Sequence, residues 1–168
     1  MKTIFDQNVI ERTIRRLSYE IIEKNKNLSH LVFLGIPTRG VTLARRIQKN
    51  IEQIEGVLIP VEVLDVSGYR DDDKKTNEKN LPNINLDNRV CILVDDVLFT
   101  GRTVRAAIDA VIDLGRPSKI HLAVLVVRGH REFPIHANYI GKNLPTSFSE
   151  KVYVHFMEDD DIENVVIG

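Results

Sequence analysis

Two adjacent carboxylates and a following turn rich in hydroxyl groups and glycine are the residues best suited to chemistry in this chain. Asp95 and Asp96 follow an apolar run, and the sequence Thr-Gly-Arg-Thr at 100–103 precedes a helical pattern. A helix N-terminus has unpaired N–H groups and a partial positive charge, so this turn can hold a phosphate. The carboxylates would repel that phosphate unless they face another part of the ligand, such as two neighbouring ribose hydroxyls. A ribose 5-phosphate meets both requirements.

The same residues also have a purely structural interpretation. Asp95 and Asp96 could cap a turn, and Thr100 or Thr103 could cap the helix, as is common where a strand leads into a helix. The segment lacks the GxxxxGK(S/T) pattern of nucleoside-triphosphate sites and the GxGxxG pattern of dinucleotide folds. Neither of these competing phosphate motifs therefore applies.

Apolar spacing along the chain predicts the elements that position this turn. Helices are predicted where apolar side chains recur at helical spacing, over residues 10–21, 41–51 and 104–111. Asp6 or Asn8 can cap the first helix, and Gly115 with Pro117 ends the last. Strands are predicted over residues 31–36, 57–66, 90–94, 121–127 and 151–156. This alternation predicts one α/β domain over residues 1–168, with a central, mainly parallel β-sheet flanked by helices.

Three other segments lack such patterns. Residues 68–88 are polar and hold little that could pack, so we expect a mobile loop there. Residues 128–145 form an excursion punctuated by Gly and Pro. The acidic segment from Glu158 to Glu163 is expected to be a solvated tail.

The composition limits the partners that the protein can attract. Lys and Arg number 23 against 24 Asp and Glu, so no overall field draws the chain to nucleic acid or to a membrane. Any anion site must therefore be built locally. The only cysteine, Cys91, lies in an apolar run and is expected to be inert, which suits a reducing compartment. The N-terminus has no long apolar stretch, so we expect a cytoplasmic protein without a membrane partner.

The segment CILVDDVLFTGRT, at 91–103, resembles the signature of type I phosphoribosyltransferases, which binds phosphoribosyl pyrophosphate (PRPP). A wider resemblance is to the PyrR family of pyrimidine-operon attenuators and uracil phosphoribosyltransferases. It is carried by LGIPTRG at 34–40, YRDD at 69–72, VDDVLFTGRTVRA at 94–106, GRPSKI at 115–120, RGHRE at 128–132 and YIGKNLPTS at 139–147. The resemblance implies a type I phosphoribosyltransferase fold, with a mobile loop at about 68–88 and a small hood at about 128–147.

The resemblance further implies transfer of a phosphoribosyl group to uracil, with UMP and pyrophosphate as products and Mg²⁺ bound to PRPP. Asp95, Asp96 and Arg39 are then the catalytic residues, and Mg²⁺ lies near the two carboxylates without a certain protein ligand. The predicted PRPP site comprises Thr38, Arg39, Gly40, Tyr69, Arg70, Asp95, Asp96, Val97, Leu98, Phe99, Thr100, Gly101, Arg102 and Thr103. The predicted base site comprises Arg128, Gly129 and His130.

One position in the signature indicates which base is accepted. Purine salvage enzymes with this signature usually carry an acidic residue just before the Thr-Gly pair, and Phe99 stands there instead. This favours a pyrimidine. Simpler alternatives remain for the other predicted residues: an ordinary tight turn at 38–40, a solvated linker after Tyr69, and an exposed loop residue at His130.

The resemblance implies a second activity, in which the UMP-loaded protein binds the mRNA leader of pyrimidine genes and promotes transcription termination. Arg12, Arg15, Arg16 and Tyr19 form the predicted RNA surface on the first helix, which a homo-oligomer, a dimer or larger, could repeat. A solvated helix face is the simpler alternative. Tyr19, His136 and Phe148 are expected near this surface, at positions where relatives usually have a basic residue.

Two further departures lie near the predicted active site and leave two alternatives open. Pro37 replaces a residue that is often basic, and Val127 replaces a usual Asp. These two residues suggest the first alternative, that the protein is a regulator that has lost catalysis. A phosphoribosyltransferase for purine salvage is the other alternative.

Overall fold

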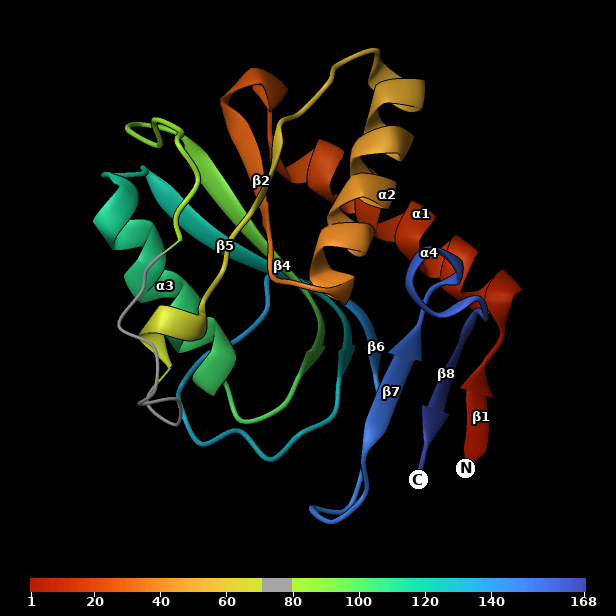
Figure 1. Ribbon diagram of the computed structural model, residues 1–168. Coiled ribbons are helices and arrows are strands. Elements are labelled where there is room, and N and C mark those ends of the chain that lie inside the picture. The colour runs from red at the N-terminus through yellow and green to blue at the C-terminus, as the bar shows by residue number, and fades with distance from the viewer. Residues whose placement is uncertain (71–79) are drawn as a thin grey trace.

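The strands of the computed structural model, which describes residues 1–70 and 80–168, form two sheets (Figure 1). The central sheet is parallel throughout and has the order β3 (Val61–Val63), β2 (Leu31–Gly35), β4 (Val90–Leu98), β5 (Lys119–Val127) and β6 (Tyr139–Asn143). A smaller antiparallel sheet has the order β1 (Lys2–Phe5), β8 (Asn164–Ile167) and β7 (Val152–His155). The predicted α/β class with a parallel central sheet is confirmed.

Three helices lie where the apolar spacing predicts them: α1 (Gln7–Lys24), α2 (Arg39–Glu55) and α3 (Arg102–Leu114). The single turn α4 (Met157–Asp160) and short 3₁₀ turns at Leu28–His30 and Ser67–Tyr69 were not predicted. Asp6, and not Asn8, caps α1, because its carboxylate accepts a hydrogen bond from the Val9 N–H. Gly56 ends α2 in the left-handed conformation, and Gly115 ends α3 as predicted.

The core has two layers because the central sheet is covered on both faces. Alternate side chains of β4 point to opposite sides, so Ile92 and Val94 pack with α1 and α2, while Cys91 and Leu93 pack with α3. Figure 1 shows α1 and α2 on one side of the sheet and α3 on the other. This two-sided burial explains why β4 has no apolar–polar alternation in its first half. The Cys91 thiol is buried, and burial raises its pKa to about 11, as expected of an inert core residue.

Two predictions about the segment after α2 are wrong in part. Residues 57–66 were expected to form one strand, yet only β3 is a strand, and its pairing with β2 stops at Val63 because β2 ends at Gly35. The stretch 68–88 was expected to hold little that packs. Within it, Leu86 is fully buried, and Leu81 and Ile84 pack against the core layer on the α3 side. Residues 71–79, the middle of the predicted mobile loop, lie outside the described residues.

The segment 128–147, predicted as the hood, contributes an unexpected strand to the central sheet. Its strand β6 pairs in parallel with β5, from Ala123 opposite Tyr139 to Val127 opposite Asn143. The separate small sheet is instead built from the two ends of the chain, which lie side by side in Figure 1.

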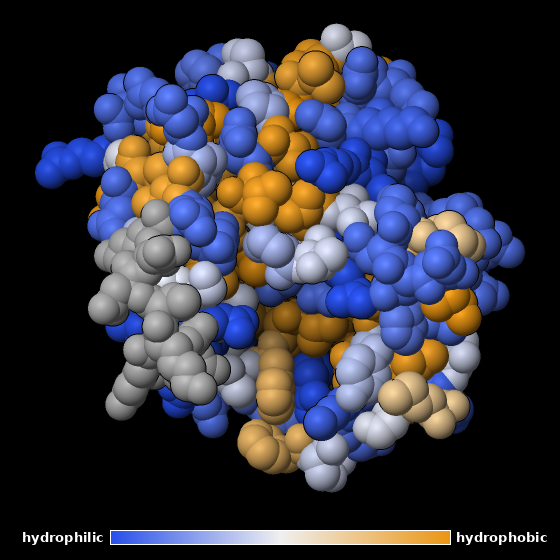
Figure 2. Space-filling view, in the orientation of Figure 1, coloured by the Kyte–Doolittle hydropathy of each residue, from blue (hydrophilic) through white to orange (hydrophobic). Residues whose placement is uncertain are grey.

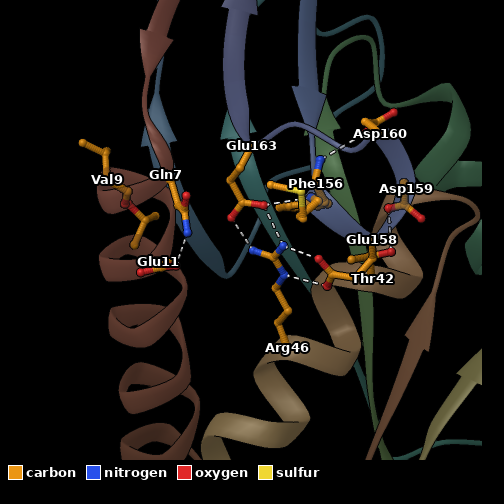
Figure 3. Close-up of polar contacts among 12 residues, drawn as sticks. Gln7, Val9, Glu11, Thr42, Arg46, Phe156, Glu158, Asp159, Asp160 and Glu163 are labelled. Atoms are coloured by element: carbon orange, nitrogen blue, oxygen red, sulfur yellow. Dashed lines mark hydrogen bonds and ion pairs between the residues drawn. The ribbon is translucent and has the colours of Figure 1, made fainter.

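The acidic segment 158–163 was predicted to be a solvated tail, and this prediction is wrong. Strand β8 is the middle strand of the small sheet, with Val165 and Val166 buried. The preceding carboxylates bind α2, where Arg46 forms ion pairs with both Glu158 and Glu163 (Figure 3). The charges of these carboxylates are neutralised by a residue more than 100 positions earlier in the chain. Composition alone does not reveal such a distant partner, so it indicated a solvated segment. Within the described residues, no helix is long and apolar enough to cross a membrane.

Candidate active site

Two adjoining cavities lie where the carboxyl ends of β2 and β4 meet the start of α3. The larger, of about 260 Å³, is lined by Ile36, Pro37, Thr38, Arg39, Arg70, Asp95, Asp96, Val97 and Thr103. The smaller, of about 100 Å³, is lined by Asp95, Val97, Leu98, Phe99, Thr100, Gly101, Thr103 and Val104. Figure 2 shows a hollow near the middle of this face, with hydrophobic residues at its back and hydrophilic side chains around it. The fold thus brings together most of the predicted PRPP site at one edge of the sheet.

The acidic doublet lies inside β4 and not beyond its end. Pairing with β5 continues in register as far as Leu98, so the strand extends four residues past the predicted limit at Val94. Asp95 is only 8% exposed, so its carboxylate does not face solvent as a side chain beyond the end of the strand would. Each carboxylate accepts a hydrogen bond from the next backbone N–H, at 2.9 Å for Asp95 and 2.8 Å for Asp96.

Burial and a like charge both act on Asp95. Burial raises the pKa of its carboxyl well above the ordinary value, and the neighbouring charge of Asp96 raises it further. The hydrogen bond from the Asp96 N–H and the charge of Arg70 act in the opposite direction. The site therefore holds negative charge at an energetic cost, which a positive centre in a bound ligand would relieve.

The turn at the start of α3, residues 100–103, has a conformation that can hold a phosphate and is called the phosphate turn below. Gly101 has φ of 92°, a left-handed conformation that favours glycine. The Thr100 carbonyl accepts hydrogen bonds from the N–H groups of Glu132 and Phe133, which hold the turn from outside. The Thr100 hydroxyl accepts a hydrogen bond from the Arg102 N–H at 3.3 Å, but the N-cap residue of α3 is Gly101, which has no side chain to cap the helix, so the capping role considered for Thr100 or Thr103 is not present. The smaller cavity lies against this turn, where N–H groups of the first turn of α3 are available to an anion.

The turn between β2 and α2 lies directly beside the doublet. A Cβ atom on Gly40 would lie 2.4 Å from the Val94 carbonyl oxygen, so only glycine allows α2 to start this close to β4. Arg39 lines the larger cavity, and its guanidinium also forms an ion pair with Asp160. The pKa of Arg39 is raised, mainly by this hydrogen-bonded carboxylate. Sequence reasoning missed Asp160, because it lies 121 residues away in a segment that had been assigned to solvent.

Tyr69 and Arg70, predicted to begin a closing loop, differ in their placement. The Arg70 guanidinium donates a hydrogen bond of 2.6 Å to the Thr103 hydroxyl and lines the larger cavity. The Tyr69 hydroxyl donates one of 2.6 Å to Asp113 on α3, and burial with this partner raises the pKa of Tyr69 to about 12. Arg70 is therefore at the site, whereas Tyr69 anchors the chain to α3 beside it.

Two of the three predicted base residues, Arg128 and His130, lie against the ring of Phe99. Gly129 between them is exposed. Arg128 is 5% exposed, and its guanidinium lies 3.9 Å from the centre of the Phe99 ring. The same guanidinium donates hydrogen bonds to the carbonyls of Ser147 and Phe148. Burial lowers the pKa of Arg128. Its side chain thus supports the Phe99 ring and the backbone at 147–148.

His130 and Phe148 complete an aromatic group with Phe99. The three ring centres lie 5.7–6.5 Å apart, and His130 meets both phenyl rings edge-on. Phe148 is 63% exposed, and sequence reasoning had placed it near the RNA surface. The structure places it next to Phe99, beside the smaller cavity.

The predicted RNA residues lie away from both cavities. Arg12, Arg15, Arg16 and Tyr19 are exposed on α1, and Arg16 forms an ion pair with Glu20. A third cavity, of about 560 Å³, lies between α1, α2 and α4 and is lined in part by Arg15, Arg45 and Lys49. It contains no residue of the doublet or of the phosphate turn, and so is separate from the site described above.

The carboxylates suit a cation that arrives with its own ligands. Among residues 1–70 and 80–168, no group of three or more His, Cys, Asp or Glu side chains is placed to hold a metal ion. Mg²⁺ prefers oxygen ligands, keeps several waters and is commonly held by one or two carboxylates together with substrate phosphates. Asp95 and Asp96, which line the larger cavity together with Arg39 and Arg70, fit that arrangement.

Comparison with known proteins agrees with this geometry. A family model described as a phosphoribosyl transferase domain matches residues 1–155. A hypoxanthine phosphoribosyltransferase structure from Trypanosoma cruzi has a TM-score of 0.77 at 17% identity, covering 99% of this chain and 95% of that one. One from Staphylococcus aureus has a TM-score of 0.75 at 19% identity, covering 98% and 90%. At these identities the structures show a shared fold only. The match to the family model shows that the chain belongs to the phosphoribosyltransferases.

Relatives of higher identity narrow the family. The chain is 54% identical over 167 residues to a protein of Streptococcus mutans named Bifunctional protein PyrR, covering 99% of this chain and 94% of that protein. It is 52% identical over 171 residues to the protein of the same name from Caldicellulosiruptor bescii, with the same coverage. The chain belongs to the PyrR family.

Proposed function

We propose that the chain transfers the phosphoribosyl group of PRPP to uracil, forming UMP and releasing pyrophosphate. One observation carries this proposal: two cavities, one against the phosphate turn and one against Arg39, meet at Asp95, Val97 and Thr103. PRPP carries a phosphate at one end of its ribose and a pyrophosphate at the other. The amide groups at the start of α3 suit the 5′-phosphate, and Thr38, Arg39 and Arg70 suit the pyrophosphate.

The doublet supplies the electrostatics of the reaction in this proposal. The bond between the anomeric carbon and pyrophosphate breaks, and the ribose ring develops positive charge. A ring nitrogen of uracil then bonds to that carbon, and the proton of this nitrogen passes to the released pyrophosphate or to water. Asp95 and Asp96 hold the ribose hydroxyls and favour this positive charge. Mg²⁺ bound with PRPP would neutralise charge on the leaving pyrophosphate and lie near the two carboxylates. No covalent bond to the protein is required.

The choice of uracil rests on the residues next to the phosphate turn and on the family. Phe99 has no group that can exchange a proton with a purine ring, and Arg128 covers one part of its ring. The backbone of 128–130 then provides donors and acceptors for the base. The PyrR relatives, at about half identity over nearly the whole chain, support a pyrimidine-related role.

A base panel tests the proposal. Purified protein with Mg²⁺ and PRPP is expected to form UMP from uracil at least about 100 times more efficiently than it forms nucleotides from hypoxanthine, guanine or adenine, since a site built for one hydrogen-bonding edge rejects others strongly. Product formation is measured by chromatography. A preference for a purine would identify a salvage enzyme, and no turnover with any base would leave a regulator without catalysis.

We also propose UMP-dependent binding to the mRNA leader of pyrimidine genes, leading to early transcription termination in the cytoplasm. Exposed Arg12 and Arg15 on α1, with Arg45 and Lys49 in the adjoining cavity, can contact phosphates, and a homo-oligomer would repeat the surface.

A gel shift with the cognate leader tests this RNA-binding role. UMP is expected to tighten binding about tenfold. Arg12→Ala with Arg15→Ala is expected to weaken binding about tenfold or more, with uracil turnover unchanged. Equal binding to unrelated RNA would contradict this role.

A further inference from the structure

One face of α2 binds the acidic segment that precedes β8. Arg39, Thr42 and Arg46 lie three and four residues apart along α2, which places them on the same face of the helix. Thr42 donates a hydrogen bond of 2.6 Å to Asp159, and Arg46 lies between Glu158 and Glu163 (Figure 3). The small sheet is therefore docked, through α4, against the helix whose first residue is Arg39.

Asp160 is the residue of this segment that contacts the active site, because it pairs with Arg39, which lines the larger cavity. Its two carboxylate oxygens accept from two nitrogens of the Arg39 guanidinium, with a distance of 3.1 Å to Nε. The Phe156 N–H donates a further hydrogen bond of 3.0 Å to the same carboxylate. The side chain of Asp160 is only 13% exposed, and Arg39 holds its pKa below the ordinary value. Asp160 is thus an ionised group with a fixed position.

The geometry of the guanidinium leaves room for a second anion. A guanidinium has five N–H donors, and a side-on pair through Nε and Nη2 uses two of them. Arg39 remains 35% exposed and lines the larger cavity together with Thr38 and Arg70. The guanidinium thus has N–H donors that Asp160 does not use, on a side chain that lines the cavity. The same arginine can therefore bind the carboxylate and a ligand at once.

We propose that Asp160 is a positioning residue, which holds Arg39 in the orientation that binds the pyrophosphate group of PRPP. This inference rests on the proposed function. A free arginine side chain must lose much rotamer freedom to bind a ligand, and a guanidinium ordered in advance avoids that cost during binding. The C-terminal segment, which contains none of the signature residues, thereby contributes to substrate affinity.

Substitution of Asp160 by asparagine tests the inference. Asn has nearly the same shape, but its NH₂ group faces an N–H of Arg39 where an oxygen accepted before, so the bidentate pair is lost. The KM for PRPP and the dissociation constant for magnesium pyrophosphate are each expected to rise about tenfold. The kcat and the KM for uracil are expected to change less than about threefold. Asp160→Glu, which restores the charge, is expected to recover part of the affinity.

A matched control distinguishes the positioning of Arg39 from a general weakening of the contact between residues 158–163 and α2. Glu158→Gln also removes a carboxylate that pairs with an arginine of α2, but that arginine is Arg46 and lines neither active-site cavity. Its KM for PRPP is expected to stay within about twofold of the parent value. Equal losses of PRPP affinity in both variants, with equal falls in melting temperature, would show a structural role only.

A double-mutant cycle completes the test. If Asp160 acts through Arg39, Arg39→Ala combined with Asp160→Asn will bind magnesium pyrophosphate no more weakly than Arg39→Ala alone. Unchanged or tighter binding by Asp160→Asn, with normal uracil turnover in the parent protein, would overturn the inference and leave the proposed function standing. Conversely, a parent protein that does not use uracil, but loses pyrophosphate affinity in Asp160→Asn, would overturn the function and leave the positioning role standing.

Discussion

Asp95→Asn is expected to abolish most turnover and, at neutral pH, to make the protein more stable. Asn keeps the shape of the side chain and an oxygen that can accept from the Asp96 N–H, so the backbone contact is retained. It removes a negative charge next to the developing positive charge on ribose. We expect kcat/KM for PRPP to fall about a thousandfold, in the range found when one preorganised electrostatic group is removed.

The gain in stability follows from the direction of the pKa shift. Burial and Asp96 raise the pKa of Asp95 in the folded protein above its value in the unfolded chain. Between these two pKa values the folded state keeps a proton that the unfolded state has released, so stability falls as pH rises from the unfolded pKa to the folded one, and above that range the buried charge is present. Asn does not carry that cost. Its melting temperature should exceed that of the parent by about 2 °C or more at neutral pH.

Differential scanning calorimetry from about pH 4 to about pH 8, with the turnover assay, checks both effects, and the difference in melting temperature should grow with pH. Asp109→Asn is the control, because it removes the same charge from a more exposed pair with Arg105 on α3. It is expected to change turnover less than about twofold and to give no such stabilisation. An Asp95→Asn protein that melts lower than the parent, or keeps a tenth of its activity, would contradict the assigned role.

Gly40→Ala is expected to impair both stability and PRPP binding. The new Cβ would lie 2.4 Å from the Val94 carbonyl oxygen and 3.2 Å from the Asp95 Cα. Both neighbours are backbone atoms of a buried strand and cannot rotate away. The start of α2 must therefore move from β4, which separates Arg39 from the doublet. We expect the KM for PRPP to rise about 100-fold, because misplacement by about 1 Å has effects of that size. Unfolding free energy should fall by about 1–3 kcal/mol.

Gly56→Ala separates the loss of alignment from a general loss of stability. Gly56 has φ of 70°, so alanine there is strained and costs about 1–2 kcal/mol, yet nothing lies within 4 Å of the new Cβ. Gly56 ends α2 at its far end, away from the active-site cavities. This variant is expected to unfold as easily as Gly40→Ala but to keep the PRPP affinity of the parent. Equal PRPP affinities in the two variants would show that the contact of α2 with β4 does not set the site.

The residues of the phosphate turn were predictable because their chemistry is local. Gly101 and the start of α3 follow from a turn signal and helical spacing within about fifteen residues. The burial of β4 on both faces follows from its uninterrupted apolar run. The strand β6 was not predictable in the same way. Tyr139 to Asn143 contain glycine and two polar residues, and they form a strand because β5 offers a free edge.

The sequence by itself determined the local elements, the acidic doublet with its phosphate turn, and the family to which the chain belongs. Only the tertiary structure decided that Asp95 is buried, that Arg128 lies on Phe99, and that Asp160 holds Arg39. The physical reason is distance along the chain. Helical spacing and turn chemistry act between neighbouring residues, whereas burial and ion pairing depend on which distant segments the packed sheet brings into contact.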